Sequence, residues 1–373
     1  MTERRTAGEA QLLLMTPGPT RVPDRVLRAG ARPMIHHRTP EFSRELAEMI
    51  ELLGPLFGTK NPVLPVHTTG RGAMEAAICN LFSPGDVIGV CCNGKFGQMW
   101  AGFAESYGLD VHRLATDWGR NVEMGEIDSF LEAQPTTRGI TVGYGETSSG
   151  GRTDVGALCT TVRDRGDAMV LVDAVSTLGG MPFAFDEWGV DVAVTASQKC
   201  LMSSPGLAFA VLSDRAWAAT ERSRLPRNYW NFADIRRETT KQRPETPGTA
   251  PVHLVLQVAE ALRMIHEEGL QSVHRRHDLM AARVRQGAAE LGLELQCPAL
   301  NARSATVTGI TLPAGIAPKL VRDELKARGI LTAAGMGPYL ETAFRIGHMG
   351  DIRVADVERT MAAVREVLAT VQS

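Results

Sequence analysis

Short apolar runs alternate with amphipathic stretches between residues 60 and 215. Apolar runs of this length, separated by segments with helical periodicity, are typical of a mostly parallel sheet with helices on both faces. We therefore expect buried strands at 63–66, 87–90, 140–142, 169–172, 192–194 and 207–212. Helices are expected between them at 74–82, 127–133 and 158–165. In an α/β sheet of this kind, ligands bind at the carboxyl ends of the strands.

The pattern changes after residue 221. Residues 222–249 are polar, carry many charges and include three prolines, so we interpret them as a long excursion of the large domain. Helical periodicity then returns at 252–268, 270–291, 319–328 and 354–371. We expect an α/β protein in three parts: an N-terminal arm at 1–18, a large domain at 19–267 and a smaller C-terminal α+β domain at 268–373.

Composition and charge narrow the class of protein. The chain has 373 residues, of which 44% are hydrophobic and 22% charged, and its formal net charge is −2. This balance gives no general attraction for nucleic acid or an anionic membrane, and no apolar run is long enough to span a membrane. The N-terminus is polar and lacks the apolar stretch of a secretory signal, so the cytoplasm is expected. None of the six cysteines forms a C-x-x-C pair, which indicates reduced, buried thiols and no metal site.

Asp173 and Lys199 carry the strongest chemical signal. Asp173 ends one apolar run, and Lys199 lies just past another, 26 positions later (199 − 173). A lysine in this place can form a Schiff base with the aldehyde of pyridoxal 5′-phosphate (PLP), and a carboxylate can keep the pyridine nitrogen protonated. Read alone, Asp173 has an alternative role as the cap of the next loop, and such a lysine often extends its amine into water.

Three other segments follow predicted strands. Thr69, Gly70 and Arg71 open a helix, where backbone N–H groups bind phosphate. Phe96 lies where a flat ring could stack on it, and a hydroxyl in the run 145–150, which includes Thr147, suits a phenolic oxygen. Their structural alternatives are a plain strand-to-helix turn, a core phenylalanine and a polar capping turn.

Two segments outside this sheet also have suitable chemistry. Thr249 follows Pro247 and Gly248 in the excursion, where hydroxyl and amide groups suit a phosphate, although a helix cap before Pro251 is the alternative. Arg345 interrupts an apolar run, and its planar fork of donors suits a carboxylate. The alternative for Arg345 is an internal ion pair.

Together these motifs resemble the class-V aminotransferases, which are PLP enzymes of fold type I, in the branch of alanine–glyoxylate and serine–glyoxylate aminotransferases. The resemblance covers nearly the whole chain, from T-P-G-P-T at 16–20 to R-I-G-H-M-G at 345–350. Its most specific parts are T-P-G-P-T, V-D-A-V-S-T-L-G-G at 172–180 and S-Q-K-C-L at 197–201. It implies a large domain with a mostly parallel seven-stranded sheet flanked by helices, and a smaller α+β domain.

The resemblance also implies a role for each site residue. Lys199 would be the Schiff-base lysine, and Asp173 the partner of the pyridine nitrogen. Thr147 would bond the phenolic oxygen of PLP, Val175 would pack on one face of the ring, and Phe96 would stack on it. The family often has tryptophan at the position of Phe96.

The remaining roles concern the phosphate and the substrate. The phosphate would be surrounded by Thr69, Gly70, Arg71 and Gln198. Thr249 would reach the phosphate of the neighbouring subunit's cofactor, which implies a homodimer with shared active sites. Arg345, together with Gly18, would bind the substrate, with the guanidinium on its α-carboxylate.

The chain also departs from the family's pattern. Arg71 stands where serine or histidine is common, and Thr246 replaces an aromatic phosphate contact. The run from His36 to Arg38 resembles part of the same branch, and it suits either the partner subunit's active site or a solvated helix start.

The expected activity is transfer of an amino group from a small amino acid, of the alanine or serine type, to a 2-oxo acid such as glyoxylate or pyruvate. Lys199 would move the proton between the substrate's Cα and C4′ of the cofactor, with ping-pong kinetics. The alternatives are a transaminase for 2-aminoethylphosphonate or ureidoglycine, or a cysteine-desulfurase-like lyase. No cysteine lies between 298 and 373, which disfavours the lyase, and T-T-G-R-G-A in place of G-x-G-x-x-G disfavours a dehydrogenase.

Overall fold

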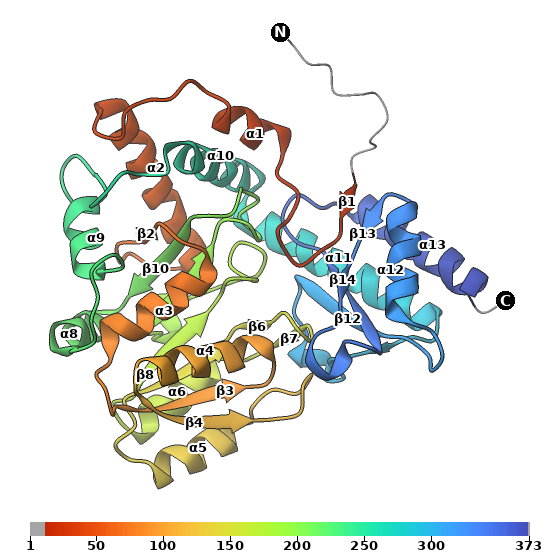
Figure 1. Ribbon diagram of the computed structural model, residues 1–373, viewed down its shortest axis with the longest axis horizontal. Helices are drawn as coiled ribbons and strands as arrows, with labels where there is room; N and C mark the ends of the chain where they lie inside the picture. The colour runs from red at the N-terminus through yellow and green to blue at the C-terminus, as the bar shows by residue number, and fades with distance from the viewer. Residues whose placement is uncertain (1–11, 372–373) are drawn as a thin grey trace.

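The computed structural model describes residues 12–371 (Figure 1). Residues 1–11 of the predicted arm at 1–18 lie outside the described residues. The helices are α1 (Asp24–Gly30), α2 (Pro40–Phe57), α3 (Gly70–Leu81), α4 (Lys95–Ser106), α5 (Met124–Ala133), α6 (Val155–Arg165), α7 (Phe185–Trp188), α8 (Asp214–Arg222), α9 (Phe232–Thr239), α10 (Val252–Glu268), α11 (Leu270–Glu290), α12 (Pro318–Ala327) and α13 (Val354–Val371).

The strands form one large sheet and three smaller ones. They are β1 (Leu13–Leu14), β2 (Leu64–Val66), β3 (Val87–Cys92), β4 (Asp110–Ala115), β5 (Gly139–Gly143), β6 (Gly145–Glu146), β7 (Gly151–Arg152), β8 (Met169–Asp173), β9 (Val192–Ala196), β10 (Ala208–Leu212), β11 (Glu294–Leu295), β12 (Val307–Thr311), β13 (Ile330–Leu331), β14 (Ala333–Ala334) and β15 (Ala343–Gly347).

The large sheet has seven strands in the order β2-β10-β9-β8-β5-β3-β4. Its neighbours are parallel except β10, which runs antiparallel to β2 and to β9. The predicted mostly parallel seven-stranded sheet is therefore confirmed. The sequence pattern identified six of these strands but not β4, an edge strand that pairs with β3 alone and mixes exposed and half-buried positions.

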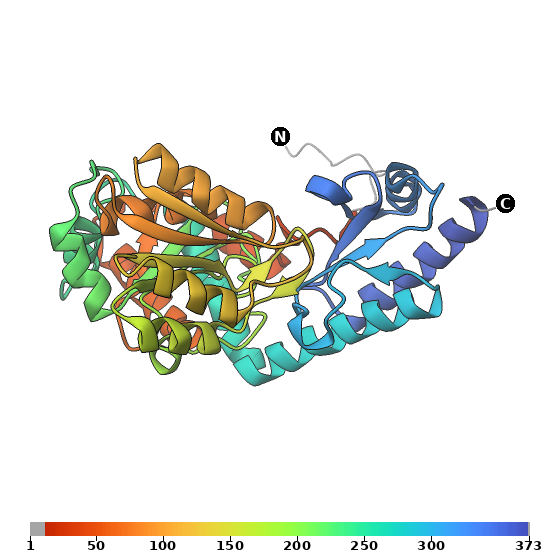
Figure 2. The same cartoon turned by 90° about the horizontal axis from the view of Figure 1, so that it is seen from below.

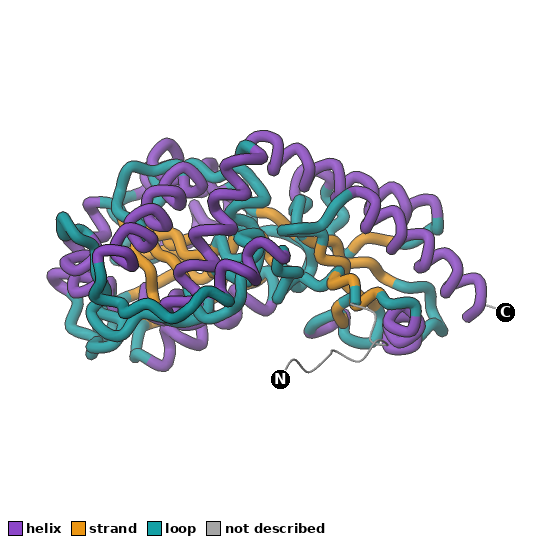
Figure 3. Tube along the Cα trace, turned by 90° about the horizontal axis from the view of Figure 1, so that it is seen from above, coloured by secondary structure: helices purple, strands orange, loops and turns teal. Residues whose placement is uncertain are grey.

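Helices cover both faces of this sheet, as the tube in Figure 3 shows. Alternate residues of a strand point to opposite faces, so the core divides into two layers. In β8, Val170 and Val172 join the layer that includes α2, α5, α6 and α10, whereas Met169 and Leu171 join the layer of α3, α4, α8 and α9. Burial on both faces explains why the central strands are continuously apolar.

The C-terminal elements form a second, smaller unit, on the right in Figures 1 and 2. Its four-stranded sheet has the order β11-β12-β15-β14, and α11, α12 and α13 contribute to a separate apolar core. Strand β1 pairs in parallel with β13, so the start of the described chain joins this unit. None of the helices within residues 12–371 is long and apolar enough to cross a membrane.

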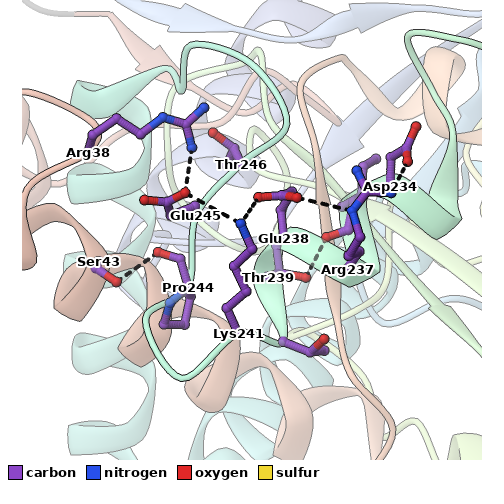
Figure 4. Close-up of polar contacts among 12 residues, drawn as sticks. Arg38, Ser43, Asp234, Arg237, Glu238, Thr239, Lys241, Pro244, Glu245 and Thr246 are labelled. Carbon is purple, nitrogen blue, oxygen red and sulfur yellow. Dashed lines mark hydrogen bonds and ion pairs between the residues drawn. The ribbon is translucent and has the colours of Figure 1, made fainter.

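The excursion at 222–249 contains the short helix α9 and is tied to the start of α2 (Figure 4). Arg38 Nη1 donates to Glu245 Oε2 at 3.0 Å, and Ser43 Oγ donates to the carbonyl of Pro244 at 2.7 Å. Thr246 is buried, and its hydroxyl donates to the carbonyl of Gly248 at 2.7 Å. These contacts fix the loop that carries Thr249.

Candidate active site

The carboxyl ends of β8 and β9 bring Asp173 and Lys199 to the same edge of the sheet. The two strands are parallel neighbours, with Asp173 paired to Val194, and Lys199 follows β9 by three residues. Asp173 is 5% exposed, and its Oδ1 accepts a hydrogen bond of 2.8 Å from the N–H of Val175. One oxygen of Asp173 therefore has a backbone donor, and the charges of Asp173 and Lys199 attract each other.

Burial shifts the pKa of both groups toward neutral pH. It raises the pKa of Asp173 to about 7, helped by repulsion from Glu146, and it lowers the pKa of Lys199 to about 8. A lysine with this pKa has far more free amine near neutral pH than an ordinary lysine with a pKa of 10.5, and a Schiff base requires the free amine. A cationic pyridine nitrogen beside Asp173 would stabilise its ionised form.

The segment before α1 closes over the lysine. Lys199 Nζ donates to the carbonyl of Pro17, and Thr20 Oγ1 donates to the carbonyl of Lys199 at 2.9 Å. Gly18 has φ +108°, and a Cβ there would lie 2.5 Å from Nζ of Lys199. The predicted substrate residue Gly18 is thus in direct contact with the predicted catalytic lysine, and only glycine fits there.

Helix α3 begins against the same edge of the sheet. Thr69 is the N-cap residue, and Gly70 and Arg71 are the first two helical residues, so the N–H groups of the first turn have no partners within the helix. A Cβ on Gly70 would lie 2.8 Å from Cγ2 of Val175, so the helix start is packed directly on this side chain. A phosphate at the helix start would place its attached ring beside Val175.

Gln198 lies between β9 and Lys199 and has an unused polar atom. Its Oε1 is buried and has no hydrogen-bond partner among the described residues. Buried amide oxygens are normally satisfied, so this atom indicates a missing group or water. The predicted phosphate residues Thr69, Gly70 and Gln198 therefore flank the Asp173–Lys199 pair.

Phe96 and Thr147 are joined by a residue that the sequence interpretation missed. Glu146 Oε2 accepts a hydrogen bond of 3.2 Å from the N–H of Phe96, in the first turn of α4. Glu146 is the last residue of β6, and Thr147 follows it directly in the chain. Glu146 therefore contacts Phe96 through a hydrogen bond and Thr147 through the backbone. The only sequence signal for Glu146 was an acid among small polar residues in G-E-T-S-S-G.

Arg345 is buried in the middle of β15. Its Nη1 donates to the carbonyl of Thr147 at 2.9 Å and its Nε to the carbonyl of Ala334 at 2.8 Å. Among residues 12–371 it has no carboxylate partner within ion-pair distance, so the predicted alternative of an internal ion pair is wrong. Burial lowers the pKa of Arg345 to about 10. An anionic ligand would supply the missing counter-charge.

Two predicted residues have exposed side chains in the single chain. Thr249 is exposed and lines a cavity of about 280 Å³ together with His67, Tyr229 and Ile235. Arg71 is exposed, and its guanidinium carbon lies 5.8 Å from the ring centre of Phe103. Within the described part of the chain, no group of three or more His, Cys, Asp or Glu is arranged to hold a metal ion.

These residues fit PLP as a group. The helix start of α3 suits its phosphate, Val175 lies in the turn after β8, Phe96 lies in the first turn of α4, and Asp173 and Lys199 suit its nitrogen and aldehyde. The orphaned Oε1 of Gln198 and the side-chain-free Gly18 lie in the same place. None of the roles assigned to these residues involves binding a metal ion.

Comparison with known proteins decides the family. The model of the family "Aminotransferase class-V" matches residues 13–353. The chain belongs to the class-V aminotransferases. It is a PLP-dependent transaminase with the fold of type I PLP enzymes, as its sequence motifs predict.

The relatives of this class-V aminotransferase have several names. The chain is 36% identical over 360 residues to the "Soluble hydrogenase, small subunit" of Synechococcus sp., covering 96% of this chain and 93% of that one. It is 34% identical over 361 residues to the L-aspartate–glyoxylate aminotransferase of Paracoccus denitrificans, covering 95% and 91%. The solved structure of an alanine–glyoxylate aminotransferase from Nostoc sp. superposes with a TM-score of 0.92 at 31% identity, covering 98% of each chain.

Proposed function

We propose that this aminotransferase moves the amino group of a small amino acid, of the alanine or serine type, to glyoxylate or pyruvate. The observation that carries this proposal is that Arg345 is buried and has no carboxylate within ion-pair distance among residues 12–371. A guanidinium binds a carboxylate through two parallel hydrogen bonds, and α-amino acids and 2-oxo acids both carry one. Relatives named for glyoxylate support the choice of acceptor.

Each site residue has a distinct task in this reaction. Bound PLP supplies an electron-withdrawing ring. Lys199 would hold the cofactor through its amine and would act as the base that moves a proton at the substrate's Cα. Asp173 would keep the ring nitrogen protonated, Thr147 would donate to the phenolic oxygen, and Arg345 would fix the substrate's carboxylate. The contact of Gly18 with Lys199 limits the space beside the amine and so favours small donors.

A panel of donors and acceptors tests the proposal. Purified protein with PLP is mixed with one donor at a time, and loss of the visible cofactor absorbance is followed in a single turnover. We expect alanine or serine to bleach the absorbance and glyoxylate or pyruvate to restore it. Bleaching only by ureidoglycine or 2-aminoethylphosphonate, or sulfide release from cysteine, would contradict the proposed substrates.

We also propose a cytoplasmic homodimer in which Thr249 of one chain binds the phosphate in the other chain's site. Support comes from the exposure of Thr249 in the single chain and from the contacts that hold its loop in place. We expect Thr249→Ala to weaken PLP binding about tenfold, the effect of losing one hydrogen bond to a charged group.

Mixed dimers test the sharing directly. A dimer of one Thr249→Ala chain and one Lys199→Ala chain contains one site with both native residues only if the sites are shared. We therefore expect one site per mixed dimer to bind PLP with the affinity of the unmodified protein. If the mixed dimer shows only the weakened affinity, each chain builds its own site.

A further inference from the structure

Glu146 is a buried acid, 2% exposed, between the predicted ring position and the start of α4. We infer that Glu146 is a positioning residue for the cofactor, which holds Phe96 and Thr147 in place and adds negative charge beside the ring. This inference rests on the proposed binding of PLP at Asp173 and Lys199.

Both oxygens of Glu146 are occupied. Oε1 accepts from the N–H of Ser148 at 2.8 Å and from the hydroxyl of Ser148 at 2.5 Å. Oε2 accepts from the N–H of Phe96 at 3.2 Å, and Ser148 Oγ accepts from the N–H of Lys95 at 3.2 Å. Glu146 and Ser148 thus cap the first two N–H groups of α4 from a different part of the chain, where the helix dipole favours a negative charge.

The same carboxylate connects three predicted cofactor and substrate contacts. Phe96 is the second residue of α4, so the cap fixes the helix turn from which its ring projects. Thr147 lies between the two residues that hold the cap. The carbonyl of Thr147 accepts from Arg345 Nη1 at 2.9 Å. The backbone at Thr147 therefore also positions Arg345, the predicted ligand of the substrate's carboxylate.

Capping alone does not explain a buried acid here. Serine, aspartate or asparagine at position 94 would cap α4 locally, but the chain has glycine. A Cβ on Gly94 would lie 2.3 Å from Cδ of Glu146, so the backbone leaves room for the carboxylate. Burial raises the pKa of Glu146, and the donors from Ser148 and Phe96 on both of its oxygens oppose that rise and favour the ionised form. As an ion it repels Asp173 and attracts Arg345, and burying a second acid near Asp173 is costly. An electron-poor cationic ring nearby would offset that cost.

The test compares Glu146→Gln with the unmodified protein in two measurements. One is the dissociation constant of PLP for the apoprotein, from an absorbance titration. The other is the pH midpoint at which the Schiff-base absorbance changes. We expect PLP binding to weaken about tenfold, because a charged hydrogen-bond acceptor is lost. We expect the pH midpoint to fall by about one unit, because a negative charge near the ring is removed.

Two further variants separate position from charge. Glu126→Gln is the matched control, because Glu126 also accepts a backbone hydrogen bond at a helix start, in α5, and it should change neither measurement. Glu146→Asp keeps the charge on a shorter side chain, so the pH midpoint should stay that of the unmodified protein while PLP binding weakens. This variant also decides the case if Glu146→Gln does not fold.

The outcomes are distinct. An unchanged pH midpoint in Glu146→Gln, with or without weaker binding, would show that the residue is only a helix cap and would overturn the inference. A midpoint that shifts in Glu146→Asp would overturn it as well. If the unmodified protein formed no Schiff-base absorbance, the proposed function would fail instead.

Discussion

At the scale of single residues, the site depends on the environment given to a few ordinary side chains. The chain has five other lysines, Lys60, Lys95, Lys241, Lys319 and Lys326, and all of them are exposed. Lys199 differs because Pro17, Gly18 and Thr20 cover it. We therefore expect burial, and not residue type, to make the amine of Lys199 more reactive than the others.

The pH dependence of cofactor capture should report this burial. Burial lowers the pKa of Lys199 to about 8, and only the neutral amine attacks an aldehyde. The rate at which the apoprotein forms the Schiff-base absorbance should thus rise as pH rises through about 8. Stopped-flow absorbance between pH 6 and 10 would measure it. A rate that continues to rise up to about pH 10.5, the ordinary value for lysine, would contradict the burial argument.

Gly18 tests the fit around the amine. In Gly18→Ala, the new Cβ would lie within 2.5–2.7 Å of three side-chain atoms of Lys199, on a backbone with φ +108°. We expect PLP affinity to fall by roughly tenfold or more, since strain of this kind costs about 1–3 kcal/mol. Gly125→Ala is the control, because a Cβ there meets nothing within 4 Å. Equal PLP affinities for the two variants would rule out the close contact.

The sequence predicted the reactive pair but not all of its support. Asp173 and Lys199 follow apolar runs, so their strand-end positions are visible in one dimension. Glu146 was missed because its partners, the N–H groups at the start of α4, lie 50 positions away and have no side-chain signature. The cover over Lys199 by Pro17 was equally invisible, since it is a contact between residues 182 positions apart.

At the scale of elements, the accuracy of the sequence reading followed burial. Helix α10 was predicted with its observed bounds, 252–268, because it presents a strongly periodic apolar face. Strand β4 was missed because only one neighbour pairs with it and its residues alternate irregularly between exposed and half-buried. The short helix α9 was missed because it lies in a polar segment, where tertiary contacts stabilise it.

The packing of α2 against α10 should be essential for the fold beneath the site. Leu53 of α2 is fully buried in this layer, whereas Leu27 of α1 is 44% exposed. We expect Leu53→Ala to lower the free energy of unfolding by about 2–5 kcal/mol, and Leu27→Ala to change it by about 0.5 kcal/mol or less. Urea unfolding followed by circular dichroism would measure both. Similar losses for the two variants would contradict the assigned core.

At the scale of the whole molecule, two buried histidines lie where the C-terminal unit meets the large sheet unit. His277 Nε2 accepts from the N–H of Gly350 at 3.2 Å, and His348 Nε2 lies 2.9 Å from Thr308 Oγ1. A Cβ on Gly180, in the large unit, would lie 3.1 Å from the ring of His277. Burial lowers the pKa of each histidine to about 3, so both are neutral in the native protein.

The free energy of unfolding should therefore fall at acidic pH, because these two histidines are buried in neutral form. Between the ordinary histidine pKa of about 6.5 and the native value of about 3, the unfolded chain binds protons that the folded chain does not, so stability falls as pH falls below about 6.5. From pH 6.5 to 5, His277→Gln should lose about 1–2 kcal/mol less than the unmodified protein. Urea unfolding at both pH values measures this, with exposed His36→Gln as control. Identical losses for His277→Gln and the unmodified protein would contradict the prediction.

The central claim is that the amine of Lys199 holds PLP beside Asp173. Borohydride reduction of the protein with PLP, followed by digestion and mass spectrometry, tests it most directly, because reduction makes the linkage permanent. We predict a single pyridoxyl-modified peptide that contains Lys199, and no modification in Lys199→Ala. Modification of any of the other five lysines in place of Lys199, or of none, would contradict the account.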